Sequence, residues 1–255
     1  MSEHYNRMVS WEEIRDQIKD ATPDGLAPID QLHSGGLAAT RLLAKFARIA
    51  KGEKVLDVGC GAGGPSRVLA GEVGAVVTAI DLAPGLIELA KRLGEVSGIP
   101  VTFEQGDALQ LPFEDASFDV VWTQHAACNI ADKPRLYAEI RRVLRPGGRL
   151  DMHDVLRGPV GGPFHMPVPC GDTEEEAFFP DPTRLKRLLV ASGLRELVWR
   201  DRTQATIAFF DRLPDPGQFS IRLVLGRRFP EMVSNLHRNL QEGRLATAMG
   251  LFEAV

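Results

Sequence analysis

A short apolar run ends in a cluster of glycines, VLDVGCGAGG over residues 55–64, and this pattern limits the folds open to the chain. Such a run predicts a buried strand, a tight turn and a following helix. Glycines allow the backbone to approach a ligand where a Cβ would clash, and the first turn of a helix presents free N–H groups. The pattern therefore predicts a ligand-binding turn, with a tight turn that binds nothing as the alternative.

Short apolar runs and helical patterns alternate after this turn, which predicts a parallel sheet with helices on both faces. Before it, we expect helices over 10–21 and 37–50, separated by a turn at 22–25. The expected strands are 54–58, 76–80, 101–105, 118–122, 149–154, 194–201 and 244–255. The expected later helices are 84–97, 134–145 (stopped by Pro146-Gly147-Gly148), 182–192 and most of 204–241, with a loop over 157–171.

Two acids narrow the choice of ligand. Gly59, Gly61 and Gly64 satisfy the GxGxxG spacing, and Asp81 ends the second strand, where an acid would bind a ribose diol. Nicotinamide, flavin and S-adenosylmethionine sites all use such a turn. Asp57 at the mouth of the first strand would repel a pyrophosphate and favour a cationic amino-acid group. Alternatively, Asp57 merely ties down loop amides.

The motifs VLDVGCGAGG (55–64), TAIDLA (78–83), GDALQLPFEDASFDVVW (106–122) and LRPGGRL (144–150) resemble those of class I S-adenosylmethionine-dependent methyltransferases. This resemblance implies a Rossmann-like α/β fold, with a seven-stranded, mostly parallel sheet, helices on both faces and an added helical cap. We expect a single methyltransferase domain over 1–255. It would comprise an N-terminal helical lid (1–45), a cofactor-binding core (46–155) and the rest of the sheet with substrate-cap insertions (156–255).

Outside the core, the resemblance is to the sarcosine/dimethylglycine methyltransferase-like group of small-molecule enzymes. It rests on DQLHSGG (30–36), WTQHAACNIADKPR (122–135), the loop near MPVP (166–169) and NLQEGR (239–244). The resemblance implies S-adenosyl-L-methionine as cofactor. It assigns cofactor contacts to Asp57, Gly59, Gly61, Asp81, Leu82, Asp107, Ala108, Thr123 and Gln124.

Polar side chains cluster where this family places its substrate. The expected substrate-binding residues are Tyr5, Gln31, Asn129 and His153, and the expected catalytic residues are His125 and His33. Methyl transfer from a sulfonium is an in-line displacement, so a general base is needed only if the nucleophile carries a proton. His125 is therefore either a general base or an orienting residue, and the methylated atom is nitrogen, oxygen or carbon.

One departure separates this chain from the phosphoethanolamine-type enzymes. Their pattern places an aspartate and a histidine where this chain has His125 and Asn129, ahead of Asp132-Lys133. The usual base of those enzymes is therefore missing from its position. The apolar residues of 156–182 and 204–243 favour an acceptor larger and more hydrophobic than sarcosine.

Charge and cysteine content exclude several other functions. The 34 acidic and 30 basic residues give a net charge of −4, so neither nucleic acid nor a membrane is an expected partner. Three widely spaced cysteines favour a reducing compartment over a disulfide framework. We therefore expect a cytoplasmic enzyme with no metal, and a homodimer is one option.

Two functions other than methyl transfer stay open. One is a nicotinamide-dependent oxidoreductase, for which a Tyr-x-x-x-Lys pair is missing, and the other is a non-catalytic cofactor-binding module.

Overall fold

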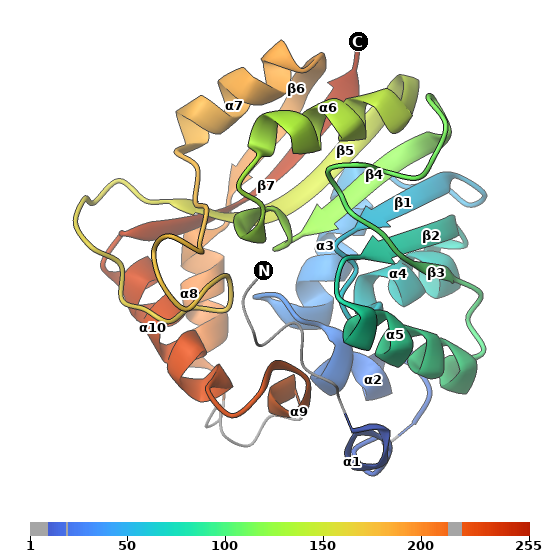
Figure 1. Cartoon of the computed structure of the whole chain (residues 1–255), viewed down its shortest axis with the longest axis horizontal. Helices are drawn as coiled ribbons and strands as arrows, with labels where there is room; N and C mark the ends of the chain where they lie inside the picture. The colour runs from blue at the N-terminus through green and yellow to red at the C-terminus, as the bar shows by residue number, and fades with distance from the viewer. Residues whose placement is uncertain (1–9, 19, 214–220) are drawn as a thin grey trace.

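The sheet of this protein has seven strands in the order β3-β2-β1-β4-β5-β7-β6 (Figure 1). The computed structural model describes residues 10–18, 20–213 and 221–255. Strands β1 to β5 pair in parallel, and β7 runs antiparallel between β5 and β6. The strands are β1 (Lys54–Val58), β2 (Val76–Asp81), β3 (Thr102–Gln105), β4 (Phe118–Gln124), β5 (Leu144–Arg157), β6 (Leu194–Asp201) and β7 (Leu245–Ala254). The predicted Rossmann-like α/β fold with a mostly parallel sheet is confirmed.

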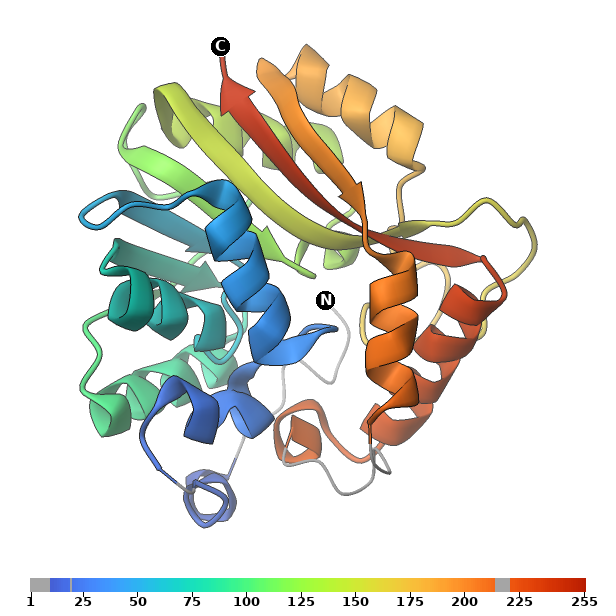
Figure 2. The ribbon, with the colours of Figure 1, turned by 180° about the vertical axis from the view of Figure 1, so that it is seen from behind.

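Alternate residues of the central strands pack on opposite faces of the sheet. Leu56 and Val121 contribute to the core beneath α6 (Lys133–Val143) and α7 (Pro182–Ala191). Val55 and Val120 contribute to the core beneath α3 (Gly36–Ala47). Because side chains alternate along a strand, central strands that are apolar on both sides require helices on both faces. Figure 2 shows α3 from the side of the sheet that it covers.

The glycine turn leads into a short helix that changes its winding. Helix α4 (Gly64–Val68) continues directly into η2 (Leu69–Val73), a single turn of π-helix. Helix α5 (Pro84–Ser97) follows β2, and its Ile87 and Ala90 pack with Phe103 of β3. The amino ends of α4 and α5 therefore lie at the carboxyl edge of the sheet, where open α/β sheets bind ligands.

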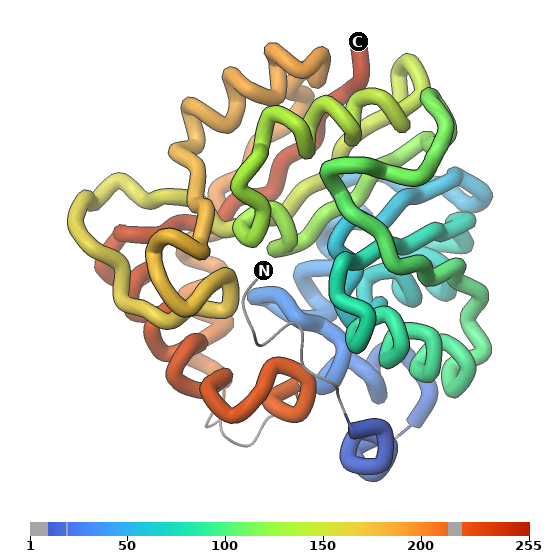
Figure 3. Tube along the Cα trace, in the orientation of Figure 1, coloured from blue at the N-terminus to red at the C-terminus, as the bar shows by residue number. Residues whose placement is uncertain are grey.

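Additional helices stand beyond that edge. From the N-terminal region come α1 (Trp11–Arg15) and α2 (Pro23–Asp30). From the segment between β6 and β7 come α8 (Thr203–Asp211), α9 (Ile221–Leu225) and α10 (Phe229–Gln241). The tube in Figure 3 follows both segments. One apolar cluster joins Leu26 of α2 to Leu225 of α9 and Leu86 of α5, so both segments contact the cofactor-binding core.

The expected boundaries at the N-terminal end were wrong in two places. The helix expected over 10–21 ends at Arg15, although Ser10 caps it as its position suggests. The segment 22–25 is not a turn, because Thr22 accepts a hydrogen bond from the Gly25 N–H and Pro23 occupies the first turn of α2. Proline in the first turn is a helix-start signal as well as a turn signal.

A further difference concerns Pro146-Gly147-Gly148, which was expected to separate a helix from a strand. The structure includes these residues in β5, and the pairing of β4 with β5 shifts register between Phe118 and Val120. The three residues therefore form an irregularity at the start of a long strand.

The described residues contain no helix that is both long and apolar enough to cross a membrane. The same part of the chain has no group of three or more His, Cys, Asp or Glu side chains arranged to hold a metal ion.

Candidate active site

The glycine turn places backbone close to two neighbours that a larger residue would displace. Gly59 has a φ of +77°, and a Cβ there would lie 2.3 Å from the Cβ of Ala126. A Cβ on Gly64 would lie 2.6 Å from the carbonyl oxygen of Asp30. The first glycine is thus required by the turn after β1. The last is required because the N-terminal segment packs directly on the amino end of α4.

Asp81, at the end of β2, holds this turn in place. One carboxylate oxygen accepts the Gly61 N–H at 2.9 Å and the other accepts the Ala83 N–H at 2.9 Å. Burial raises the pKa of Asp81, while these N–H groups act in the opposite direction. Each carboxylate oxygen can accept more than one hydrogen bond, so both can still bind a ligand hydroxyl.

A cavity of about 450 Å³, hereafter the cofactor cavity, opens beside the turn. The expected cofactor residues that line it are Gly59, Gly61, Asp81, Leu82, Asp107, Ala108 and Gln124. Leu82 is 46% exposed there, which leaves an apolar face uncovered. Asp107 accepts the Leu109 N–H at 2.8 Å, so its loop turns back along the rim of the cavity.

Two expected cofactor residues, Asp57 and Thr123, do not line this cavity. Both are buried. Asp57 accepts a hydrogen bond of 2.5 Å from the Ser66 hydroxyl. Burial raises the pKa of Asp57 to about 7, Ser66 lowers it and the charge of Asp81 raises it further. Asp57 therefore lies beneath the turn, where it would act on a ligand through its charge and through α4.

A buried ion pair fastens the N-terminal segment to α4. Arg67 and Asp30 are 1% and 2% exposed, and Nη2 of Arg67 lies 2.7 Å from Oδ2 of Asp30. The same guanidinium donates to the carbonyl oxygens of Ala62 and Ala90, whereas its Nε has no partner. Burial raises the pKa of Asp30 against the attraction of Arg67. The pair fixes the end of α2 above the glycine turn.

Hydrogen bonds continue from this pair to the strand edge. The Thr40 hydroxyl of α3 donates to Oε1 of Gln31 at 2.8 Å and lies 3.3 Å from Oε1 of Gln124. The Trp122 indole N–H also donates to Oε1 of Gln124, at 3.2 Å. Because Oε1 faces these donors, Nε2 of Gln124 is left buried without a protein partner. Gln124 therefore offers an unused donor at the wall of the cofactor cavity.

A second cavity of about 370 Å³, hereafter the acceptor cavity, adjoins the first. His125 and Leu32 line both cavities. The acceptor cavity is largely apolar, and its walls come from α2, α3, the loop before α7, and α8 to α10. Its apolar lining residues include Leu37, Phe209, Phe210, Leu213, Ile221, Leu225, Phe229, Val233 and Leu236.

Three histidines lie close together, with His125 at the junction of the cavities. The ring centroid of His125 lies 6.0 Å from that of His33 and 4.7 Å from that of His153. Burial lowers the pKa of His33 to about 4 and of His153 to about 3, and lowers that of His125 well below its ordinary value. All three rings are therefore neutral near neutral pH.

His125 has an unusual backbone conformation for a residue with a side chain. Its φ is +52°, and its N–H donates to the carbonyl oxygen of His153 at 2.8 Å. Residues held in the left-handed region cluster at functional sites. The Ser34 hydroxyl lies 3.1 Å from Nε2 of His125 and fixes one side of the ring. Nδ1 of His125 has no hydrogen-bond partner among the described residues.

The expected substrate-binding residues occupy different positions. Gln31 lines the acceptor cavity, as does the expected catalytic residue His33, whereas Asn129 lines the cofactor cavity. His153 lines neither cavity, is 2% exposed, and has two ring nitrogens without partners. Tyr5 lies outside the described residues.

The cysteines were expected to indicate a reducing compartment and not a disulfide framework, but the structure pairs two of the three. Cys128, in the turn after His125, is bonded to Cys170, which lines the acceptor cavity. Their Cα atoms are 5.8 Å apart, although 42 positions separate the two residues in sequence. Spacing alone could not reveal this pair, because segment 158–180 returns to the end of β4 only in the folded chain.

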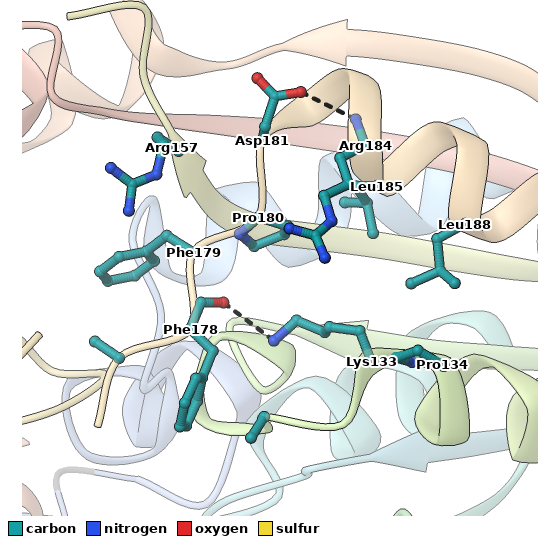
Figure 4. Close-up of a pocket in the computed structure, with 12 residues that line it drawn as sticks. Lys133, Pro134, Arg157, Phe178, Phe179, Pro180, Asp181, Arg184, Leu185 and Leu188 are labelled. Carbon is teal, nitrogen blue, oxygen red and sulfur yellow. Dashed lines mark hydrogen bonds between the residues drawn. The ribbon is translucent and has the colours of Figure 1, made fainter. Parts of the chain in front are cut away.

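Lys133 fixes the same segment by a different route. Its ammonium group donates to the carbonyl oxygen of Phe178 at 3.0 Å (Figure 4). It also donates to the carbonyl oxygens of Ala127, at 2.7 Å, and Ile130. Burial lowers the pKa of Lys133 to about 8. All three donors are used within the protein. Lys133 also lines a further cavity of about 470 Å³ with Arg157 and Arg184, and Ala131 and Phe178 line both this cavity and the cofactor cavity.

Sequence reasoning missed several residues of the site. Ser34 and Leu32 belong to the recognised segment 30–36, but nothing in that segment pairs Ser34 with a histidine 91 positions away. The position of Thr40 did offer a signal, because it is a polar residue on the otherwise apolar face of α3, and the structure buries it fully. Nothing in the sequence indicated the ion pair between Arg67 and Asp30, because it forms only when α2 packs on α4.

Comparison with known proteins places these features in a family. Residues 56–151 match the methyltransferase domain family. The chain is 37% identical over 130 residues to methyltransferase GfsG of Streptomyces halstedii. It is 38% identical over 127 residues to the 27-O-demethylrifamycin SV methyltransferase of Amycolatopsis mediterranei. These matches cover 50% and 48% of this chain and 47% of each relative. The chain thus spans about half the length of these curated relatives.

A solved structure shares the fold. The putative sarcosine dimethylglycine methyltransferase of Galdieria sulphuraria superposes with a TM-score of 0.70 at 21% identity, covering 85% of both chains. Together with the family match, the sheet order and the glycine turn followed by Asp81, this establishes the type of domain. Residues 56–151 therefore belong to a class I methyltransferase domain, whose cofactor is S-adenosylmethionine.

Proposed function

We propose that this protein transfers a methyl group from S-adenosylmethionine to a small-molecule acceptor. The observation that carries the proposal is the junction at His125, which lines both the cofactor cavity and the largely apolar acceptor cavity. A methyl donor in the first cavity and a nucleophile in the second would meet there. In this proposal residues 1–255 act as one domain, with the N-terminal segment and the 156–255 insertions closing over the core.

The residues of the cofactor cavity fit S-adenosylmethionine. The space beside Gly59 and Gly61 would accept its amino-acid part, and the carboxylate of Asp81 would accept both ribose hydroxyls. The exposed face of Leu82 would pack on the adenine, whose edge would meet Asp107 and Ala108. The unpartnered Nε2 of Gln124 would donate to the amino-acid end of the cofactor. Asp57 and Thr123 would support this arrangement from beneath.

When bound, the cofactor supplies a methyl group on a cationic sulfur that is already a good leaving group. The protein then has to align the nucleophile, exclude water and hold any proton that is released. Positioning of this kind contributes roughly 7–11 kcal/mol to lowering the barrier. We assign alignment to Gln31, His33 and Asn129, and proton acceptance to the neutral ring of His125. His153, which packs behind His125, would keep that ring in place.

The test is a calorimetric titration followed by a labelled transfer assay. We expect micromolar binding of S-adenosylhomocysteine and no measurable binding of NAD. We also expect a labelled methyl group to appear on a small molecule when the protein is supplied with extracts and labelled S-adenosylmethionine. Binding of NAD without any response to S-adenosylhomocysteine would support an oxidoreductase instead. Binding of S-adenosylhomocysteine without transfer to any acceptor would support a non-catalytic module.

Replacing Asp81 with alanine is expected to weaken S-adenosylhomocysteine binding by about tenfold to a hundredfold. A hydrogen bond to a charged acceptor contributes roughly 1.5–3 kcal/mol. Calorimetry measures the change in affinity, and a thermal melt shows whether the variant is folded. Asp201, another acid at the end of a strand, provides the matched control, and Asp201→Ala should leave the affinity unchanged. Unaltered affinity in folded Asp81→Ala would refute the ribose assignment.

A further inference from the structure

The acceptor cavity has almost no charge with which to recognise a charged ligand. Among its described lining residues, Asp24 is the only Asp, Glu, Lys or Arg. Its carboxylate is already paired with Arg41, with Oδ2 lying 2.6 Å from Nη2. A buried charge that finds no partner is strongly disfavoured. The described walls therefore provide no cation for a phosphate or carboxylate and no free carboxylate for an ammonium group.

The apolar walls are open to a ligand. Leu37 of α3 and Phe209 and Phe210 of α8 line the cavity and are only partly buried. In Figures 1 and 2, α8 and α10 lie on one side of the carboxyl edge of the sheet, and α2 and α3 lie on the other. A volume of about 370 Å³ is within the range of pockets that bury most of a drug-sized ligand. An acceptor that fills it would be mainly hydrocarbon.

Three polar side chains of the cavity, His33, Ser34 and His125, lie close together where it meets the cofactor cavity. Ser34 lies 3.1 Å from Nε2 of His125, and the ring centroids of His33 and His125 are 6.0 Å apart. When Nε2–H donates to the Ser34 hydroxyl, Nδ1 carries the lone pair of the neutral ring. Nδ1 can then accept a proton from a group placed at the junction. The geometry thus favours a nucleophile that is uncharged on binding and has one proton to give.

We propose that the acceptor is an uncharged, largely hydrocarbon molecule that presents one hydroxyl group to His125. This inference rests on the proposed methyl transfer. In the reaction, a bond forms between the hydroxyl oxygen and the methyl carbon as the carbon–sulfur bond breaks. The bonding electron pair goes to the sulfur, which becomes neutral. The hydroxyl proton goes to Nδ1 of His125 and then to solvent, so the products are a methyl ether, S-adenosylhomocysteine and one proton.

Three probes with the same hydrocarbon tail test this acceptor class: para-octylphenol, para-octylbenzoate and para-octylbenzylamine. Each is titrated into the protein saturated with S-adenosylhomocysteine, and each is assayed with S-adenosylmethionine by mass spectrometry. We expect the phenol to bind at least tenfold more tightly than either charged probe and to be the one that is methylated. Equal or tighter binding of a charged probe, methylation of the amine, or no binding of the phenol would overturn the inference. The initial titration with S-adenosylhomocysteine separates such a result from failure of the proposed function itself.

Phe209→Ala and Phe209→Lys test the location of the site. We expect Phe209→Ala to weaken phenol binding about tenfold and Phe209→Lys to shift the preference toward the benzoate. Phe46 of α3 provides the matched control, since it is a partly buried phenylalanine that packs beneath the sheet instead. Phe46→Ala should leave phenol binding unchanged, and S-adenosylhomocysteine affinity should be the same in all three variants. Unchanged phenol binding in both Phe209 variants would place the acceptor elsewhere.

Discussion

Asp30→Ala is expected to lower the free energy of unfolding by about 3–5 kcal/mol, because it leaves a buried guanidinium without its partner. Arg67 is 1% exposed, and its Nε already lacks a hydrogen bond. Much of the attraction within the pair offsets the cost of burying both charges. The loss therefore reflects the isolated Arg67 more than the contact itself. Chemical denaturation followed by circular dichroism measures the change.

Two variants make this prediction specific. Glu88→Ala breaks an exposed pair with Arg92 on α5 and should cost no more than about 0.5 kcal/mol. The double variant Asp30→Leu with Arg67→Met replaces both charges with apolar groups and should recover much of the lost stability. If Asp30→Ala costs no more than Glu88→Ala, the pair does not anchor the N-terminal segment. Because Gly64 packs against the carbonyl of Asp30, Asp30→Ala should also weaken S-adenosylhomocysteine binding.

Removing the imidazole of His125 is expected to lower turnover by roughly a hundredfold or more, while S-adenosylhomocysteine affinity changes by no more than a few-fold. His125→Ala and His125→Asn should be compared, since His125 has a φ of +52°. Asparagine tolerates this left-handed conformation better than alanine does. A similar loss in both variants would assign the effect to the ring and not to backbone strain. Retained turnover with a raised acceptor KM would instead assign His125 an orienting role.

The pH profile gives a second measurement on His125. Burial lowers the pKa of this ring well below its ordinary value, with smaller contributions from His153 and His33. The neutral, active form therefore exists above the lowered pKa and is lost only as the pH falls through it. Turnover should be constant above about pH 6.5, the ordinary value for histidine, and should decline only in more acidic solution. An inflection at or above that pH, absent in His125→Asn, would contradict the inferred neutral ring.

The local parts of the fold were predictable from sequence because they depend on neighbouring residues. Strand β1 and helix α5 begin and end where periodicity places them. Asp81 could be assigned to the end of β2 because the apolar run stops there. The prediction of a turn at 22–25 was wrong, because the local sequence Thr-Pro-Asp-Gly contains the signals for both a β-turn and a helix start. Only the packing of Leu26 against α5 and α9 favours the helix.

The missed features all join segments that are distant in sequence. Ser34 meets His125, Arg67 meets Asp30, and Cys128 meets Cys170 only after the N-terminal and C-terminal additions close over the sheet edge. No periodicity encodes these distances. The division of the site into two cavities that meet at His125 likewise depends on where α8 and α10 lie. Sequence therefore predicted the kind of cofactor cavity better than it predicted the chemistry of the acceptor cavity.

The proposed reaction requires the sulfur of the cofactor to face the junction of the two cavities, and a crystal structure of the S-adenosylhomocysteine complex shows whether it does. We predict that the ribose hydroxyls bind the Asp81 carboxylate, that the adenine lies on Leu82, and that the sulfur points past Leu32 toward His125. A ligand bound with its sulfur away from His125, or bound outside the cofactor cavity, would show that the methyl donor and the acceptor do not meet at His125.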